Sequence, residues 1–152
     1  KLLESIRGKD VYIISDTHNY NITYQMYGKE HNMSPDDHFQ DIKREISSRR
    51  CVVLGTSNPE VDHKNGMKNE GRVMRNEAQC LSDFQPLSKA ANDAKRQYCK
   101  ECRRTGIRYD AKKLGYPISY YAGGAEHHGE ENACIGCYWY DPLEFKRHLT
   151  KK

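Results

Sequence analysis

The sequence contains no run of apolar residues long enough to cross a lipid bilayer, and no pattern typical of a secretory signal peptide. Apolar residues are also few: they make up 36% of the 152 residues, whereas 30% are charged. We therefore expect no membrane partner. The length suits one domain or two small ones, but a core this lean needs a metal or a partner to help stabilise it.

The cysteines are not spaced like those of a disulfide-rich secreted protein, because four of the six form two CxxC pairs. Such pairs favour metal binding in a reducing compartment, so we expect a cytoplasmic location. Two cysteines three apart can turn both sulfurs to one point, and two such pairs complete the tetrahedral thiolate shell that Zn²⁺ prefers. The sequence therefore predicts a structural zinc ion with four ligands: Cys99, Cys102, Cys134 and Cys137. The alternative is two reduced pairs that share no metal.

The 31 residues between the two pairs are more than in the commonest zinc fingers, but they are loop-rich and can fold back. His127 and His128 lie in this stretch, and adjacent histidines in a glycine-rich loop are usually exposed rather than ligands. A closed four-thiolate shell leaves no open position for chemistry, so we expect this zinc to stabilise the fold.

The positive charge is concentrated in one segment. The net charge of the whole chain is +4, yet the segment from Lys89 to Lys113 holds nine Lys and Arg residues against three acidic ones, a local excess of six. Such a cluster attracts the phosphate backbone of nucleic acids through counterion release. The alternative is an ordinary solvated helix face.

Residues 1–50 read as a strand, a loop and a helix. The apolar, β-branched run at 10–15 predicts a buried strand. Ser34 can cap a helix that starts at Pro35, and apolar residues then recur at helical spacing. That spacing predicts a buried stripe formed by Phe39, Ile42 and Ile46.

From position 51 the character of the chain changes. Residues 51–66 predict two short strands around a Gly/Asn/Pro turn, and a helix is expected to begin near Leu87. A last helix is expected after Asp141, which can cap it, with Pro142 in the first helical position. The predicted docking face of this helix consists of Phe145 and Leu149.

Two segments carry a family resemblance: EVDHKNG at 60–66, with an aspartate beside a histidine, and DFQPLSKAANDAKR at 83–96. Together they resemble the HNH nuclease family, whose unit is two strands and a helix around one divalent metal. Over 51–152 the chain resembles HNH proteins of the restriction-endonuclease kind. The resemblance implies an α+β fold: a ββα-metal, treble-clef-like module with a structural zinc site and an N-terminal strand–loop–helix appendage.

The resemblance implies a metal-dependent endonuclease and gives roles to particular residues. His63 is the expected general base, because a neutral imidazole titrates near physiological pH. Asp62 and Asn92 are the expected ligands of a catalytic Mg²⁺ or Mn²⁺ ion, which prefers oxygen donors. Asp83 stands where the family usually has an asparagine that steadies the base, and an aspartate hydrogen-bonded to the imidazole would raise the histidine pKa. The expected contacts to DNA phosphates are Lys89, Lys95, Arg96, Arg103 and Arg104.

One part of the family pattern is missing. The positions of a second zinc knuckle pair hold Cys51, Leu54, Ser88 and Ala91, so a single thiolate remains there. One thiolate does not hold zinc, and we expect either apolar packing in its place or a weakened nuclease core. Cys51 and Cys80 are then expected to be free thiols.

Residues 1–50 resemble a fragment of phosphoribosyl-pyrophosphate synthetase-like proteins. The residues that carry the resemblance are Arg7–Ile14, Asn19–Tyr20 and Met33–His38. The phosphate-binding and metal-binding loops of that family have no counterpart in the sequence, so the resemblance implies scaffold rather than activity. We expect two units, 1–50 and 51–152, with the first loosely packed because one strand and one helix cannot complete a parallel sheet.

The expected function is metal-dependent hydrolysis of double-stranded DNA, as in a restriction enzyme, by a monomer or a homodimer. One alternative is a non-catalytic, zinc-stabilised module that binds nucleic acid. A second alternative is a nucleotide-metabolism fragment related to the synthetase.

Overall fold

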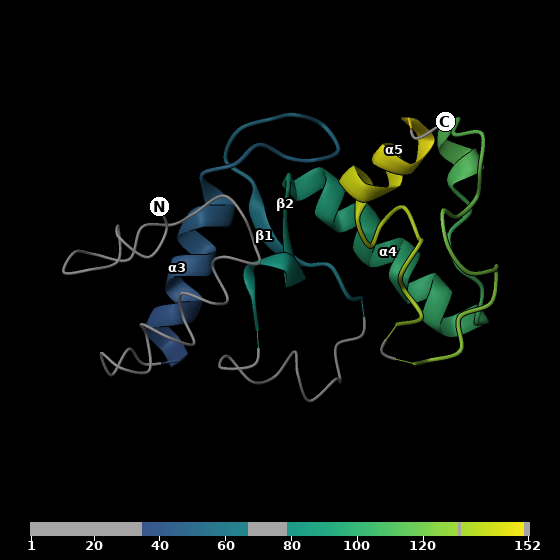
Figure 1. The fold of residues 1–152 in the computed structure, drawn as a ribbon, viewed down its shortest axis with the longest axis horizontal. Coiled ribbons are helices and arrows are strands. Elements are labelled where there is room, and N and C mark those ends of the chain that lie inside the picture. Colours follow the sequence, from purple (N-terminus) through teal and green to yellow (C-terminus); the bar gives the residue numbers. More distant parts are fainter. Residues whose placement is uncertain (1–34, 67–78, 131, 151–152) are drawn as a thin grey trace.

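The computed structural model describes residues 35–66, 79–130 and 132–150 as a mixed α/β fold (Figure 1). A two-stranded antiparallel sheet lies between the helices α3 (Pro35–Ser47) and α4 (Lys89–Thr105). The chain closes with the helix α5 (Pro142–Thr150). None of the helices in the described part of the chain is both long and apolar enough to span a membrane.

The sheet pairs β1 (Glu60–His63) with β2 (Phe84–Leu87), which places Asp62 opposite Gln85 and His63 opposite Phe84. Only Ser88 separates β2 from α4, and its hydroxyl oxygen accepts a hydrogen bond from the Ala91 N–H at 3.2 Å. This N-cap starts the helix at once, so α4 packs back against both strands. The resulting order of two strands and a helix agrees with the expected ββα arrangement.

The helix α3 begins at Pro35, as predicted, and packs against the sheet. Ile42 and Ile46 are fully buried against Leu81 and Phe84, with Phe39 at the edge of the same cluster. The expectation of a loosely packed first unit is therefore wrong for its helix. The strand predicted at 10–15 lies outside the described residues.

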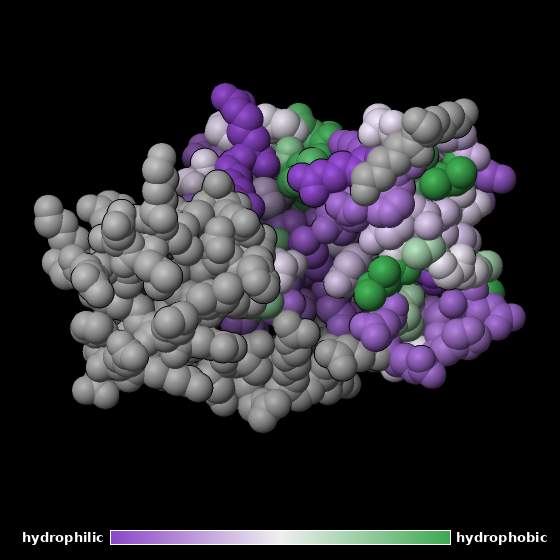
Figure 2. Space-filling view, in the orientation of Figure 1, coloured by the Kyte–Doolittle hydropathy of each residue, from purple (hydrophilic) through white to green (hydrophobic). Residues whose placement is uncertain are grey.

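A second apolar cluster lies under α5. Asp141 caps this helix, as predicted, because its Oδ1 accepts the Glu144 N–H at 3.0 Å. Phe145 is fully buried there, with Leu149 packed at the edge. Three more buried residues complete the cluster: Ala111, Tyr138 and Trp139. The clusters are small, and Figure 2 shows hydrophilic residues over most of the described surface on this face.

The first of the two strands predicted within 51–66 is wrong. Residues 51–54 form a turn in which the Gly55 N–H donates to the Cys51 carbonyl at 2.8 Å and the Leu54 N–H donates to Cys51 Sγ at 3.3 Å. Gly55 has a positive φ of 69°, which suits a turn rather than a strand. The partner of β1 is instead β2, which lies further along the chain.

The positions where the resemblance expected a second zinc knuckle form an apolar contact. Cys51, Leu87 and Ala91 are buried together, so the expected apolar packing is present at this point. Leu54 contributes little to this contact, because it is 56% exposed. Of these two residues, Ala91 packs in the cluster and Leu54 does not.

Candidate functional site

The end of β1 and one face of α4 enclose a cleft of about 390 Å³. Asp62 and His63 enter it from β1, and Asn92 enters it from α4. The structure thus brings together the dipeptide and the helical asparagine that lie about thirty positions apart in the sequence. The cleft is also lined by Asn65, Lys95, Arg96 and Arg103.

The Asp62 carboxylate is held by two donors from different elements. Gln85, opposite it on β2, donates from Nε2 to Asp62 Oδ2 at 2.9 Å. The Lys95 ammonium from α4 forms an ion pair with the same oxygen. Lys95 is only 3% exposed, so this carboxylate meets a largely desolvated positive charge.

Asn92 is buried and its amide is oriented by a residue that the sequence analysis did not single out. Its Nδ2 donates to Glu60 Oε2 at 2.7 Å, and its Oδ1 has no hydrogen-bond partner within the described residues. Glu60 and Asp62 are two apart on β1 and therefore point to the same side of the strand. The two-residue alternation of side chains along a strand could have identified Glu60 as a neighbour of the site from the sequence.

The His63 ring packs against Phe84, and the Asn65 main chain lies near it. It meets the Phe84 ring edge-on, with the centroids 5.1 Å apart. Neither ring nitrogen makes a well-aligned hydrogen bond within the described residues, although the nearby Asn65 main chain acts to raise the His63 pKa. Burial lowers the pKa of His63, and this effect outweighs the nearby Asp83 carboxylate, which acts to raise it. The imidazole is therefore neutral at physiological pH and can accept a proton.

Asp83 does not hold the imidazole, contrary to expectation. Its Oδ2 accepts hydrogen bonds from the Cys80 N–H at 2.8 Å and from the Cys80 thiol at 3.2 Å. Its carbonyl oxygen accepts the Lys64 N–H at 2.7 Å. The aspartate thus fixes the turn before β2. Its charge acts to raise the His63 pKa, as expected, but burial has the larger effect and the net shift is downward.

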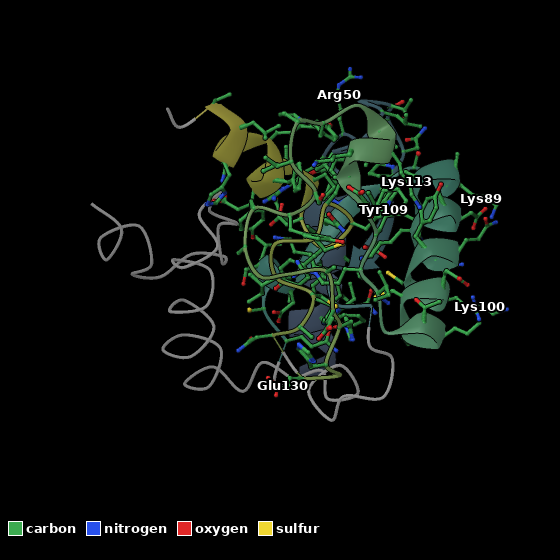
Figure 3. The ribbon with its side chains drawn as sticks, turned by 90° about the vertical axis from the view of Figure 1, so that its right-hand side faces the viewer. Arg50, Lys89, Lys100, Tyr109, Lys113 and Glu130 are labelled. Carbon is green, nitrogen blue, oxygen red and sulfur yellow. The ribbon has the colours of Figure 1, made fainter. Side chains whose placement is uncertain are left out.

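The basic candidates on α4 divide into two groups. Lys95 points inward, whereas Lys89, Arg96, Arg103 and Arg104 are exposed. Arg96 and Arg103 line the cleft, while Lys89 is paired with Asp93 at 3.0 Å. Arg104 is paired with Glu101. Figure 3 shows Lys89 and Lys100 extending outward from the helix.

The four cysteines of the CxxC pairs line one small cavity of about 30 Å³ beside the cleft. Cys99 and Cys102 come from α4, and Cys134 and Cys137 come from the turn that precedes α5. Burial raises the pKa of Cys99 to about 12 and that of Cys102 to about 11. Within the described ranges, no three or more His, Cys, Asp or Glu side chains lie in positions from which they could hold a metal ion together, so the four cysteines share a cavity without forming a metal site in this structure.

His127 lies closer to these cysteines than the sequence suggested. Its Nε2 is 3.5 Å from Cys134 Sγ, and its Nδ1 accepts the Gly129 N–H at 3.2 Å. His128, by contrast, is exposed beside Glu126. Because Nδ1 is an acceptor, Nε2 carries the proton in the neutral ring and donates to the sulfur.

The fold is thus a mixed α/β protein with a ββα unit and a polar cleft between its hairpin and its helix. The chain belongs to the ICEA protein family, whose model matches residues 22–152. It is also 46% identical over 120 residues to a type II restriction enzyme, NlaIII, from Neisseria lactamica. That alignment covers 74% of this chain and 52% of the relative, so the chain spans about half the length of the curated relative it matches. No solved structure matches the chain significantly.

The family match crosses position 50, where the sequence suggested a join between two units. Residues 22–50 are therefore covered by the same family model as the remainder of the chain. The resemblance of 1–50 to phosphoribosyl-pyrophosphate synthetase-like proteins receives no support from these comparisons.

Proposed function

We propose that the chain is the catalytic module of a restriction-type DNA endonuclease of the HNH, or ββα-metal, class. The substrate is the phosphodiester backbone of double-stranded DNA. The observation that carries the proposal is that Asp62, His63 and Asn92 line one cleft at the junction of β1 and α4. The similarity to a type II restriction enzyme supports the same reaction class.

His63 is the general base of this proposal. Its neutral ring has two nitrogens without hydrogen-bond partners among the described residues, so one of them can receive a proton from an attacking water. The edge-on contact with Phe84 fixes the plane of the ring without using either nitrogen. Burial keeps the ring unprotonated, as a base requires.

Asp62 and Asn92 are the proposed ligands of a divalent cation, Mg²⁺ or Mn²⁺. The fit is supported by Asn92 Oδ1, a buried oxygen without a partner within the described residues, together with the Asp62 carboxylate on the same cleft. Both are the hard oxygen donors that these cations prefer. When bound, the cation would offset the negative charge that develops on the phosphate.

A structural zinc ion is the second proposed metal. The fit is supported by the four cysteine side chains that line one cavity of about 30 Å³. A tetrathiolate site there would link α4 to the turn before α5, and so offset the small size of the apolar clusters. The exposed cations on α4, Arg96 and Arg103 foremost, are proposed to bind DNA phosphates at the cleft.

The test of the nuclease proposal is cleavage of unmethylated plasmid and genomic DNA by the chain with Mg²⁺ or Mn²⁺. The variant His63→Ala should lose at least a hundredfold in rate, whereas His128→Ala, which removes an exposed imidazole, should cut like the original chain. Circular dichroism establishes that both variants are folded. Undiminished cutting by His63→Ala would exclude His63 as the base.

A second candidate function is DNA binding without cleavage. The observation in its favour is the Lys95 ammonium, which already neutralises the Asp62 carboxylate. This alternative requires DNA binding that weakens steeply with salt, and intact DNA with every divalent metal. Specific cutting by the purified chain would eliminate it.

A further inference from the structure

Arg108 is a buried cation for which the described residues provide no acidic partner. It is 4% exposed and forms no ion pair within the described ranges. A buried guanidinium is costly unless a negative charge compensates it. The counter-charge of Arg108 must therefore be sought in its surroundings.

The guanidinium is fixed by main-chain oxygens of the loop between the cysteine pairs and of the second pair itself. Nη1 donates to Ala122 O at 3.1 Å and to Gly124 O at 3.0 Å, and Nη2 donates to Ile135 O at 2.6 Å. Nε is buried and has no partner among the described residues. Carbonyl oxygens are neutral acceptors, so these bonds orient the cation without compensating its charge.

The loop around the guanidinium leaves room for it. Gly123 has a positive φ of 70°, and a Cβ at that position would lie 2.6 Å from Arg108 Nη1. The Arg108 guanidinium also lies over the Tyr120 ring, with Cζ 4.6 Å from the ring centroid. The site therefore holds a planar cation in one defined position.

Arg108 lines the same 30 Å³ cavity as the four cysteines of the CxxC pairs. Four thiolates around one Zn²⁺ ion carry a net charge of minus two. We propose that Arg108 is a buried counter-charge of this tetrathiolate, a positioning residue that offsets part of the negative charge of the site and fixes the turn bearing Cys134 and Cys137. This inference rests on the structural zinc of the proposed function and on no part of the nuclease mechanism.

Arg108 belongs to the basic segment Lys89–Lys113 but differs from its exposed members. Arg108 contributes to the local excess of positive charge in the sequence, but its charge is directed at the cysteine cavity. It does not belong with the exposed cations that are proposed to bind DNA. Salt-dependent DNA binding should therefore be insensitive to Arg108 in variants that retain the fold and the zinc.

The experiment measures zinc content and zinc affinity of the purified chain by competition with a chromogenic chelator, and the absorption of the Co²⁺-substituted protein. The original chain should retain one zinc per chain. Arg108→Met should lower the apparent zinc affinity by roughly 10- to 100-fold, the range typical of outer-sphere partners. Arg147→Met, which removes an exposed arginine, is the matched control and should leave zinc affinity unchanged.

Two further variants separate charge from loop anchoring and serve if Arg108→Met does not fold. Arg108→Lys keeps the cation, and Arg108→Gln keeps a donor without charge, so the lysine variant should bind zinc more tightly than the glutamine variant. Equal affinities in these two variants, or unchanged affinity in Arg108→Met, would overturn the inference while leaving the zinc site in place. Absence of zinc from the original chain would overturn the zinc proposal itself, whatever the nuclease assay shows.

Discussion

The ammonium of Lys95 holds the end of β1, because it pairs with the Asp62 carboxylate and donates to the carbonyl oxygen of His63 at 2.7 Å. It also donates to the carbonyl oxygen of Lys64 at 3.0 Å. One buried side chain on α4 therefore sets the positions of the proposed metal ligand and the proposed base. The Lys95 side chain therefore points into the protein and not toward solvent, where it could contact DNA.

Replacing Lys95 should destabilise the fold as well as the site. Lys95→Met leaves the Asp62 carboxylate without its ion pair and two carbonyl oxygens without a donor, and we expect a loss of about 3–5 kcal/mol in unfolding free energy. Urea denaturation followed by circular dichroism measures this loss. The matched control is Lys100→Met, an exposed lysine on the same helix, which should change stability by less than about 0.5 kcal/mol. Equal effects of the two variants would contradict the role of Lys95.

Glu60 should matter for cleavage because it orients the Asn92 amide. In Glu60→Ala the Asn92 Nδ2 loses its acceptor, and the amide can rotate away from the cleft, so we expect the cleavage rate to fall roughly tenfold or more. Glu60→Gln retains a side-chain oxygen as acceptor and should recover most of the rate. The measurement is single-turnover cutting at saturating Mg²⁺. Equal rates for the alanine and glutamine variants would argue against this orienting bond.

The pKa of His63 predicts a pH dependence of stability without added Mg²⁺ or Mn²⁺. Burial depresses the pKa of the folded state below its ordinary value of 6.5, so the unfolded chain binds the proton more readily. The contribution of neutral His63 is then fully present above pH 6.5 and is lost as the pH falls toward the folded-state pKa. Urea midpoints of the original chain and of His63→Ala between pH 7.5 and pH about 5 should therefore converge on acidification. A difference that grows at low pH would contradict the depressed pKa.

Gly136 should not tolerate a side chain. Its φ is 91°, and a Cβ there would overlap the main chain of Ala122, so Gly136→Ala must displace the loop that packs on the cysteine turn. We expect a loss of about 2 kcal/mol or more. Gly115→Ala is the matched control: its φ is 87°, but a Cβ there meets no atom within 4 Å, so only the conformational cost of about 1 kcal/mol applies. Thermal unfolding of both variants distinguishes the overlap from the strain.

Short-range features of the fold were predictable from the sequence. The starts of α3 at Pro35 and of α5 after Asp141 follow from capping residues and from proline at the first helical turn. The buried positions of Ile42, Ile46 and Phe145 follow from helical spacing. The motif residues Asp62, His63 and Asn92 were identified from their types and order, and the structure brings them to one cleft.

Strand pairing was not predictable in the same way. Val52 and Val53 are β-branched, but a turn forms at 51–54, where the Gly55 N–H donates to the Cys51 carbonyl and the Leu54 N–H donates to the Cys51 sulfur. The strand Phe84–Leu87 pairs with β1 although 20 residues separate the two strands in the sequence, and such a pairing depends on tertiary contacts rather than on local pattern.

The amino-acid sequence by itself determined where α3 and α5 start, which residues are proposed to act on a phosphodiester, and that four cysteines occur in pairs. Only the tertiary structure decided which basic side chains are buried: Lys95 pairs with Asp62, and Arg108 lies beside the cysteines. In the sequence both belong to a basic run that resembles a solvated face. Burial separates them from their exposed neighbours, because removing a charge from water makes its nearest partner its main source of stabilisation.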